Sequence, residues 1–145
     1  MKRFLFCCSM NSIRSPVAVA ILQHKLRVKD NVKKDGILIS SAGVEQGILD
    51  GFIASIMKER GTHLIDYEPK SIAYLAMQPW DLIVAFTSAS YKVVKEIALR
   101  TGAKVVLWEV DDPSVFEGNR EQKIDKYREV CNDIEKLINT NFKHL

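Results

Sequence analysis

The stretch FLFCCSMNSIRSP, residues 4–16, decides the fold of this chain. It opens with a short apolar run that ends in two adjacent cysteines, Cys7 and Cys8. A short, mostly apolar run bounded by polar residues is typical of a strand that is buried on both faces of a sheet. Ser15-Pro16 then predicts the start of a helix, with serine as N-cap and proline as first residue. The stretch therefore predicts a strand, a loop and a helix.

The same alternation continues along the rest of the chain. Besides RFLFCC at 3–8, strands are predicted for GILISS at 36–41, DLIVAF at 81–86 and AKVVLW at 103–108. Helical patterns follow Ser15-Pro16, begin near Asp50 and stop at Gly61, follow Ser88, and extend from residue 119 to the C-terminus. Strands that alternate with helices predict a parallel sheet with helices on both faces, which is a Rossmann-like α/β fold. The length of 145 residues predicts a single domain over residues 1–145.

The composition excludes several classes of protein. The net charge of +3 is spread along the chain without a cluster of Lys and Arg, so we expect no nucleic-acid partner. The apolar part of the N-terminus is shorter than a signal core, and no apolar segment approaches the length of a membrane span, so we expect no membrane association. We expect a monomer or a weak dimer.

The cysteines and histidines predict neither a disulfide framework nor a metal site. Three cysteines, two of them adjacent, are typical of a protein in the reducing cytoplasm. Cys7 and Cys131 stand at apolar positions and are predicted to belong to the core. His24, His63 and His144 lack the spacing of metal ligands, so we expect neither a metal nor another cofactor.

The predicted topology brings four loops together. Right-handed crossovers place the carboxyl ends of parallel strands along one edge of the sheet, and ligands bind at that edge. Residues 8–15 follow the first strand, and SAG (41–43), TSAS (87–90) and EVDDPS (109–114) follow the other three. We therefore expect these segments to face one another.

The loop after the first strand has the chemistry of an anion site with a nucleophile. A loop that leads into a helix N-terminus presents backbone N–H groups and a partial positive charge to an anion. Arg14 adds a planar fork that can bind two phosphate oxygens, and Cys8 is expected to be a thiolate in this positive environment. We predict that Cys8 attacks phosphorus and forms a cysteinyl-phosphate intermediate, while Ser15 donates a hydrogen bond to the sulfur. The residues predicted to bind the substrate are Ser9, Met10, Asn11, Ser12, Ile13, Arg14 and Ser15.

A general acid is predicted in the loop after the fourth strand. Hydrolysis of a phosphate ester needs a group that protonates the leaving oxygen and later takes a proton from water. Asp112 precedes Pro113, which favours an extended backbone and keeps the carboxylate out of a helix. We assign Asp112 as this group, with Asp111 as the alternative.

These residues resemble a known family. CSMNSIRSP (8–16) is similar to the C-x5-R-S signature of the low-molecular-weight protein tyrosine phosphatases, and SSAGV (40–44), WDLIVAF (80–86), DDP (111–113) and EGNREQKIDKYREV (117–130) extend the likeness over nearly the whole chain. The resemblance implies a four-stranded parallel sheet in a three-layer sandwich, with Cys8 as nucleophile, Arg14 as phosphate clamp and Asp112 as acid. It also implies that Asn11 holds the loop through bonds to Ser15 and Ser41.

Some positions depart from the pattern of the family. Met10 replaces a usual glycine, and Ile13 replaces a second loop cysteine. Ser114 and Val115 stand where aromatic residues usually wall the phosphotyrosine pocket, with Phe116 one position late. Tyr67 replaces a histidine that usually supports the loop, and we expect it to serve packing, as do Trp80 and Trp108.

Three functions are compatible with this pattern. The first is hydrolysis of phosphate monoesters. The substrate would be a phosphorylated protein or a small phosphate ester, with phosphotyrosine as the main candidate. The second is an arsenate reductase-like thiol enzyme, which needs further cysteines near residues 80–95 that the chain lacks. The third is a phosphate-binding module without turnover, which would lack a working acid.

Overall fold

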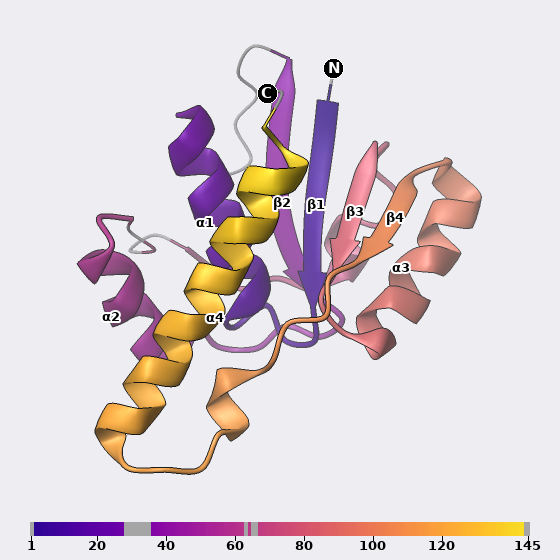
Figure 1. Cartoon of the computed structure of the whole chain (residues 1–145). Helices are drawn as coiled ribbons and strands as arrows, with labels where there is room; N and C mark the ends of the chain where they lie inside the picture. Colours follow the sequence, from indigo (N-terminus) through magenta and orange to yellow (C-terminus); the bar gives the residue numbers. More distant parts are fainter. Residues whose placement is uncertain (1, 28–35, 63, 65–66, 144–145) are drawn as a thin grey trace.

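The computed structural model describes residues 2–27, 36–62, 64 and 67–143. At its centre is a four-stranded parallel sheet in the order β2-β1-β3-β4 (Figure 1). The strands are β1 (Lys2–Cys8), β2 (Ile37–Gly43), β3 (Leu82–Ala85) and β4 (Lys104–Leu107). The α/β prediction is confirmed, and all four carboxyl ends lie at one edge, at the bottom of Figure 1.

The end of β2 differs from the prediction. Pairing with β1 continues in register from Lys2↔Ile37 to Cys8↔Gly43, so the SAG segment forms the last three residues of the strand and not a loop after it. The parallel bridge between Gly43 and Ser71 extends the pairing at this point. The prediction of a strand end at residue 41 was wrong because the apolar pattern fades before the backbone pairing does.

Helices cover both faces of the sheet and form the outer layers. One face is covered by α1 (Arg14–Leu26), α2 (Gly51–Glu59) and α4 (Arg120–Asn141), and the other by α3 (Ser88–Thr101) (Figure 1). Alternation along β1 divides the core accordingly: Phe6 and Cys8 point to the first face, and Leu5 and Cys7 to the second. Two short 3₁₀ helices, η1 (Ile72–Tyr74) and η2 (Pro113–Val115), lie within the longer connections.

The start of α1 corrects the prediction for Ser15. The helix begins at Arg14, and Ile13 stands at the N-cap position without a side-chain capping bond. Ser15 lies inside the first turn, where its hydroxyl contacts Cys8 and Asn11 instead of capping the helix. The predicted ends of the second helix are confirmed, since Asp50 caps α2 through the amide of Ile53, and Gly61 follows it with φ of 78°. The last helix was predicted to reach the C-terminus, but α4 ends at Asn141.

The three cysteines are free and buried, and the two outside the loop belong to the core as predicted. Burial, with a smaller effect of neighbouring Cys8, strongly raises the pKa of Cys7. Burial also raises the pKa of Cys131 to about 11. Trp80 and Trp108 are buried as well, in agreement with their predicted packing role. Among the described helices, none combines the length and the apolar character that crossing a bilayer requires.

Replacing Cys131 by alanine should reduce the sensitivity of the protein to alkaline pH. The pKa of this thiol is about 11 in the folded protein against an ordinary value of 9.0, so the folded state holds the proton more tightly. The resulting stabilisation is complete below pH 9.0 and is lost as the pH rises towards 11. The Cys131→Ala variant has no thiol to titrate and does not lose this stabilisation, but the small cavity that it creates makes it less stable than the wild type at neutral pH. The melting temperatures of the wild type and of the variant should therefore converge between neutral pH and pH 11. Parallel curves would contradict the assignment.

Candidate active site

The candidate site lies at the carboxyl end of β1, where the order of the strands reverses. From β1 the chain continues to β2 at one edge of the sheet, and from β3 it continues to β4 at the opposite edge. Open α/β sheets bind ligands at the point between two such strands. A cavity of about 260 Å³ opens there. It is lined by Cys8, Ser9, Met10, Ser12, Ile13, Arg14, Ile48, Asp50, Asp112 and Ser114.

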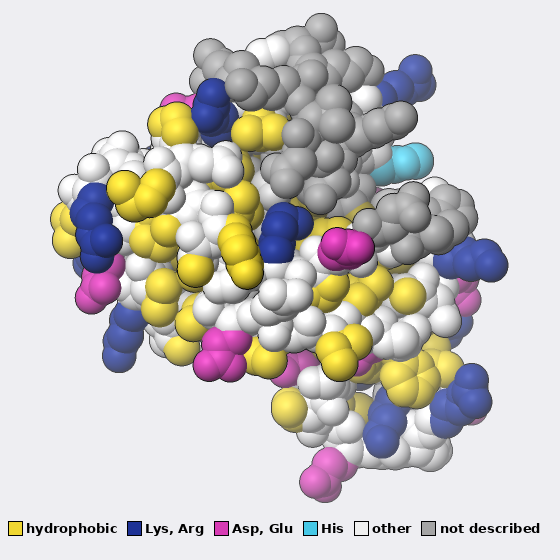
Figure 2. All heavy atoms as spheres, turned by 180° about the vertical axis from the view of Figure 1, so that it is seen from behind, with side chains coloured by type: hydrophobic (Ala, Val, Ile, Leu, Met, Phe, Trp, Pro, Cys, Tyr) yellow, Lys and Arg dark blue, Asp and Glu magenta, His cyan; other side chains and the backbone are white. Residues whose placement is uncertain are grey.

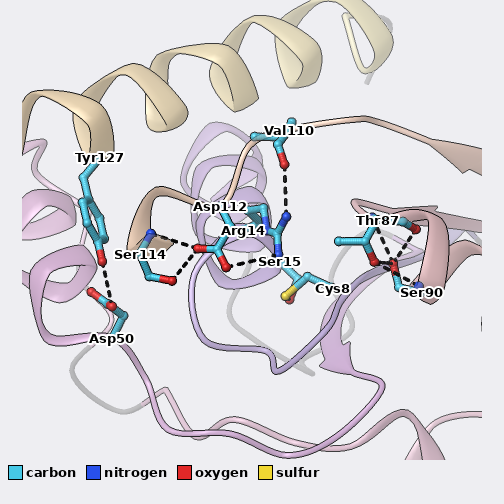
Figure 3. Close-up of polar contacts among 10 residues, drawn as sticks. All are labelled: Cys8, Arg14, Ser15, Asp50, Thr87, Ser90, Val110, Asp112, Ser114 and Tyr127. Carbon is cyan, nitrogen blue, oxygen red and sulfur yellow. Dashed lines mark hydrogen bonds and ion pairs between the residues drawn. The ribbon is translucent and has the colours of Figure 1, made fainter. Parts of the chain in front are cut away.

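The segment after β3 does not line this cavity, contrary to the expectation that all four loops meet. Thr87 and Ser90 instead form a reciprocal capping box at the start of α3. Figure 3 shows this pair apart from the group around Cys8 and Arg14. The cavity is therefore built by the loops after β1, β2 and β4.

The loop of residues 9–13 is held from outside by the segment 44–50. The carbonyl oxygens of Cys8, Ser9 and Ser12 accept hydrogen bonds from the amides of Val44, Glu45 and Asp50, at 3.0, 3.0 and 3.2 Å. In a planar trans peptide the N–H points away from the C=O. The N–H groups of Ser9, Met10 and Ile13 are thus turned away from segment 44–50. This orientation is the one that the predicted anion cradle requires.

Two glycines allow the two segments to approach each other. A Cβ atom on Gly43 would lie 2.6 Å from the nitrogen of Asn11, and one on Gly47 would lie 2.8 Å from the carbonyl oxygen of Met10. Neither contact is sterically tolerable, because both involve backbone atoms. The glycine of the SAG segment is therefore required by packing against the loop.

The side chain of Asn11 fixes the shape of the loop. Asn11 has φ of 56°, a left-handed conformation that asparagine tolerates better than most residues. Its Oδ1 accepts from the amide of Lys70 at 2.9 Å and from the hydroxyl of Tyr67 at 2.6 Å. Its Nδ2 donates to Ser15 Oγ at 2.8 Å and to Ser41 Oγ at 3.2 Å. The buried amide thus uses two acceptor and two donor positions.

This network also positions the hydroxyl that contacts Cys8. Since Asn11 supplies a proton to Ser15 Oγ, the proton of the Ser15 hydroxyl remains free to be donated. The sulfur of Cys8 lies 2.9 Å away, closer than the alternative acceptor, the carbonyl oxygen of Ala42 at 3.4 Å. The Ser15 hydroxyl is thus within hydrogen-bonding distance of both the sulfur and the carbonyl oxygen, with the sulfur the nearer of the two.

Tyr67 packs against the core as predicted, and it is also part of this hydrogen-bond network. Its hydroxyl donates to Asn11 Oδ1 and forms a short hydrogen bond with Ser41. Because Tyr67 donates its proton to Asn11, the Ser41 hydroxyl is the donor in the second bond. The Nζ of Lys70 lies 4.9 Å from the centre of the Tyr67 ring. Sequence reasoning missed this role because Tyr67 lies 56 residues from Asn11.

Arg14 and Asp112 face each other across the cavity (Figure 3). Arg14 Nη1 donates to the carbonyl oxygen of Val110 at 3.1 Å, and Nη2 lies 3.9 Å from Asp112 Oδ2. Asp112 is extended, with φ of −86° and ψ of 109°, as its place before proline predicts. Its Oδ1 accepts from the amide and the hydroxyl of Ser114 at 2.9 and 2.6 Å. Oδ2 is thus the oxygen turned towards Arg14.

The alternative acid, Asp111, lies outside the cavity. Its side chain is exposed and pairs with Lys126 Nζ at 3.1 Å, and the pair raises the pKa of Lys126. The arrangement favours Asp112 over Asp111 as the residue that faces a bound substrate.

Ser114, which stands where the family has a pocket wall, lines the cavity, as do two residues that were not predicted as site residues, Ile48 and Asp50. Asp50 was expected only as a helix cap, yet its second oxygen accepts a hydrogen bond from Tyr127 at 2.8 Å, and the residue lines the cavity. Its place between the second strand and the second helix was the signal that could have identified it. Met10, whose orientation the sequence left open, lines the cavity and is 41% exposed.

The described part of the chain contains no cluster of three or more His, Cys, Asp or Glu side chains suited to a metal. His63 and His144 lie outside the described residues.

A family comparison agrees with this geometry. Residues 3–145 match the family described as low molecular weight phosphotyrosine protein phosphatase. The chain belongs to this family. It is therefore an enzyme of the phosphatase class with the α/β fold of that family.

Known relatives of this phosphatase include two kinds of enzyme. A curated relative, the arsenate reductase of Halalkalibacterium halodurans, is 29% identical over 139 residues, covering 96% of this chain and 94% of the relative. Among solved structures, the tyrosine phosphatase AmsI of Erwinia amylovora has a TM-score of 0.71 at 23% identity, with 96% and 92% of the two chains covered. The tyrosine phosphatase Wzb of Escherichia coli, in complex with sulphate, has a TM-score of 0.73 at 20% identity, with 97% and 98% covered. At these identities the structural matches show a shared fold.

Removing the hydroxyl of Tyr67 should lower both the stability and the catalytic efficiency of the phosphatase. Tyr67→Phe leaves Asn11 Oδ1 and Ser41 each without one hydrogen bond in a partly buried place, a loss of about 1–3 kcal/mol. We expect a lower melting temperature and a kcat/KM for an aryl phosphate that is about tenfold lower, which corresponds to ~1.4 kcal/mol. Tyr74→Phe, at a 74% exposed position, is the matched control. Equal behaviour of the two variants would show that the hydroxyl does not support the loop.

Proposed function

We propose that this phosphatase hydrolyses phosphate monoesters through a covalent phosphate on Cys8, with Arg14 as phosphate clamp and Asp112 as general acid and base. The observation that carries the proposal is the position of the Cys8 sulfur. It lies 2.9 Å from the hydroxyl oxygen of Ser15, in the cavity that Arg14 and Asp112 also line. A thiolate, an anion cradle and a carboxylate in one cavity are the parts that two-step phosphoryl transfer needs.

In the first step the thiolate of Cys8 attacks phosphorus. An S–P bond forms while the ester P–O bond breaks, and protonated Asp112 donates its proton to the leaving oxygen. The amides of the loop and the guanidinium of Arg14 stabilise the charge on the three remaining phosphoryl oxygens. The released product is an alcohol or a phenol.

In the second step a water molecule attacks the phosphorus of the intermediate. Asp112, now a carboxylate, takes a proton from the water as the P–O bond forms and the S–P bond breaks. Inorganic phosphate leaves, and Cys8 returns as a thiolate stabilised by Ser15. Asp112 Oδ2 is suited to both proton transfers, because Oδ1 is engaged by Ser114.

The proposed substrate is phosphotyrosine in a protein, or a small aryl phosphate. Two solved relatives are tyrosine phosphatases, and Wzb of Vibrio vulnificus has been solved with benzylphosphonate. In the described cavity the apolar walls are Met10, Ile13 and Ile48, without an aromatic ring. Aliphatic side chains can pack on a phenyl ring by dispersion, although they lack the additional ring–ring interaction of an aromatic wall.

The arsenate reductase relative makes a redox function the second candidate. Such a reaction needs a second thiol that reaches the catalytic sulfur. The chain has three cysteines in all. Cys7 points to the opposite face of the sheet from Cys8, and Cys131, on α4, is buried in the core against Met57. Neither is placed to exchange with Cys8, so hydrolysis is the better supported function. The three free thiols also support the expectation of a reducing, cytoplasmic location.

Replacing the nucleophile should abolish turnover but preserve binding. Cys8→Ser should hydrolyse neither para-nitrophenyl phosphate nor a phosphotyrosine peptide, because a serine hydroxyl remains protonated in this site. It should still bind vanadate, since the cradle and Arg14 are retained. The matched control, Cys131→Ala, should keep full turnover. Hydrolysis by Cys8→Ser would exclude the covalent route, and arsenate reduction by the wild type with an added thiol would favour the redox function.

Removing the acid should affect poor leaving groups most. Asp112→Ala should lower kcat for phenyl phosphate by about 10²–10⁴-fold, the usual contribution of general acid catalysis, and should affect para-nitrophenyl phosphate much less. Asp111→Ala, the neighbouring exposed carboxylate, is the matched control and should change both rates little. A fall of equal size for both substrates in Asp112→Ala would reject Asp112 as the acid.

A further inference from the structure

Exposed apolar side chains gather around the catalytic cavity. Eight large hydrophobic side chains are exposed among the described residues. Five of them line the cavity or lie within two residues of a lining residue, and we call these the apolar rim: Met10, Ile48, Phe52, Val115 and Phe116. Ile48 is 86% exposed and Val115 is 73% exposed, so the rim faces solvent. Exposed apolar residues that cluster around a site, unlike scattered ones, mark a binding surface.

The rim is attached to the catalytic cavity by specific contacts. The ring of Phe52 lies 5.5 Å from that of Tyr127, whose hydroxyl donates to Asp50 in the cavity wall at 2.8 Å. Val115 ends η2, which begins directly after Asp112, and Asp112 caps it. The rim is thus carried by the same loops that carry the site, and Phe52, Val115 and Phe116 lie outside the cavity lining itself.

The loops around the cavity are acidic, although the protein as a whole is basic. The connections from each strand end to the next α-helix contain no Lys or Arg but six carboxylates, in a chain of net charge +3. These are Glu45, Asp50, Glu109, Asp111, Asp112 and Glu117. In the lower part of Figure 2, hydrophobic side chains neighbour acidic ones and also basic ones.

Few cations oppose these carboxylates. Arg14 stands at the cavity floor and is engaged by Val110, and Lys126 pairs with Asp111. Arg120 and Lys123 belong to the first turn of α4. Glu45, in the connection after β2, and Glu117, next to Phe116 of the rim, are both exposed to solvent.

We propose that the apolar rim docks a protein segment in which apolar and basic residues flank the phosphorylated residue. The proposal rests on the function proposed above, because the phosphoryl group must occupy the cradle. The remainder of the substrate is covalently attached to that group and therefore has to lie across the rim. A small phosphate ester would leave Phe52, Val115 and Phe116 uncovered.

The charge of the flanking residues determines which segment binds best. Arg14 and the loop amides neutralise the negative charge of the phosphoryl group, whereas the substrate residues on either side of it lie near the carboxylates of Glu45 and Glu117. Lys or Arg in the flanks are attracted to these carboxylates, and Asp or Glu are repelled. Exposed ion pairs of this kind change rates severalfold and are weakened by salt.

A matched set of peptides tests this proposal. Three phosphotyrosine peptides share the same apolar neighbours but carry Lys, Gln or Glu in the flanks. The wild type should hydrolyse them in the order Lys, Gln, Glu, with kcat/KM differing severalfold at each step and the differences shrinking at high salt. Glu117→Gln should reduce the ratio of kcat/KM between the Lys and Glu peptides. Glu96→Gln, an exposed position on α3, is the matched control and should leave this ratio unchanged.

The apolar part of the proposal is tested separately. Val115→Ser should lower kcat/KM for the Lys peptide relative to para-nitrophenyl phosphate, and replacing the apolar residues of the peptide by serine should have the same effect. Equal rates for the three peptides, or a ratio that Glu117→Gln leaves unchanged, would overturn the proposal while hydrolysis of para-nitrophenyl phosphate continues. If Cys8→Ser hydrolyses para-nitrophenyl phosphate as the wild type does, it is the proposed function that fails.

Discussion

The side chain of Asn11 is the group on which the catalytic loop depends. Its four hydrogen bonds join Ser15, Ser41, Tyr67 and Lys70, and they hold a residue in a left-handed conformation that is otherwise unfavourable. Because Nδ2 donates to Ser15, and the Ser15 hydroxyl lies 2.9 Å from the sulfur of Cys8, the same side chain that shapes the loop also holds the hydroxyl beside the sulfur. The shape of the loop and the position of the hydrogen-bonding partner of Cys8 therefore have one common origin.

The fold and the loop could be predicted from the sequence for a simple reason. The strands are short apolar runs, the helices follow the period of 3.6, and the residues of the loop are contiguous, so local patterns contain the information. Tyr67, Ile48 and the second role of Asp50 could not be predicted in the same way. They reach the site from irregular connections without periodicity, and only the packing of segment 44–50 and of residues 67–71 against the loop brings them there. Ser15 was misassigned as a cap because its hydroxyl serves the sulfur.

Phosphatases and arsenate reductases share this fold, so the fold alone does not select the reaction. The difference has to come from what surrounds the sulfur. In this chain the neighbouring thiol is on the far side of the sheet, and burial holds it and Cys131 in the protonated, unreactive form. The sulfur of Cys8 shares its cavity with the carboxylate of Asp112, whereas Cys7 and Cys131 are absent from the cavity lining, which favours the proposed transfer of a phosphoryl group over transfer of electrons.

The two glycines behind the loop divide the site into a rigid rear and an adaptable front. Any side chain at Gly43 or Gly47 would collide with backbone, so the rear wall tolerates no redesign. Met10, Ile48, Val115 and Phe116 face solvent, and changes of these side chains would leave the backbone of the loop in place. An engineer who wishes to redirect this enzyme to another phosphorylated molecule therefore has a defined set of positions to vary, with the reacting groups held constant by the architecture behind them.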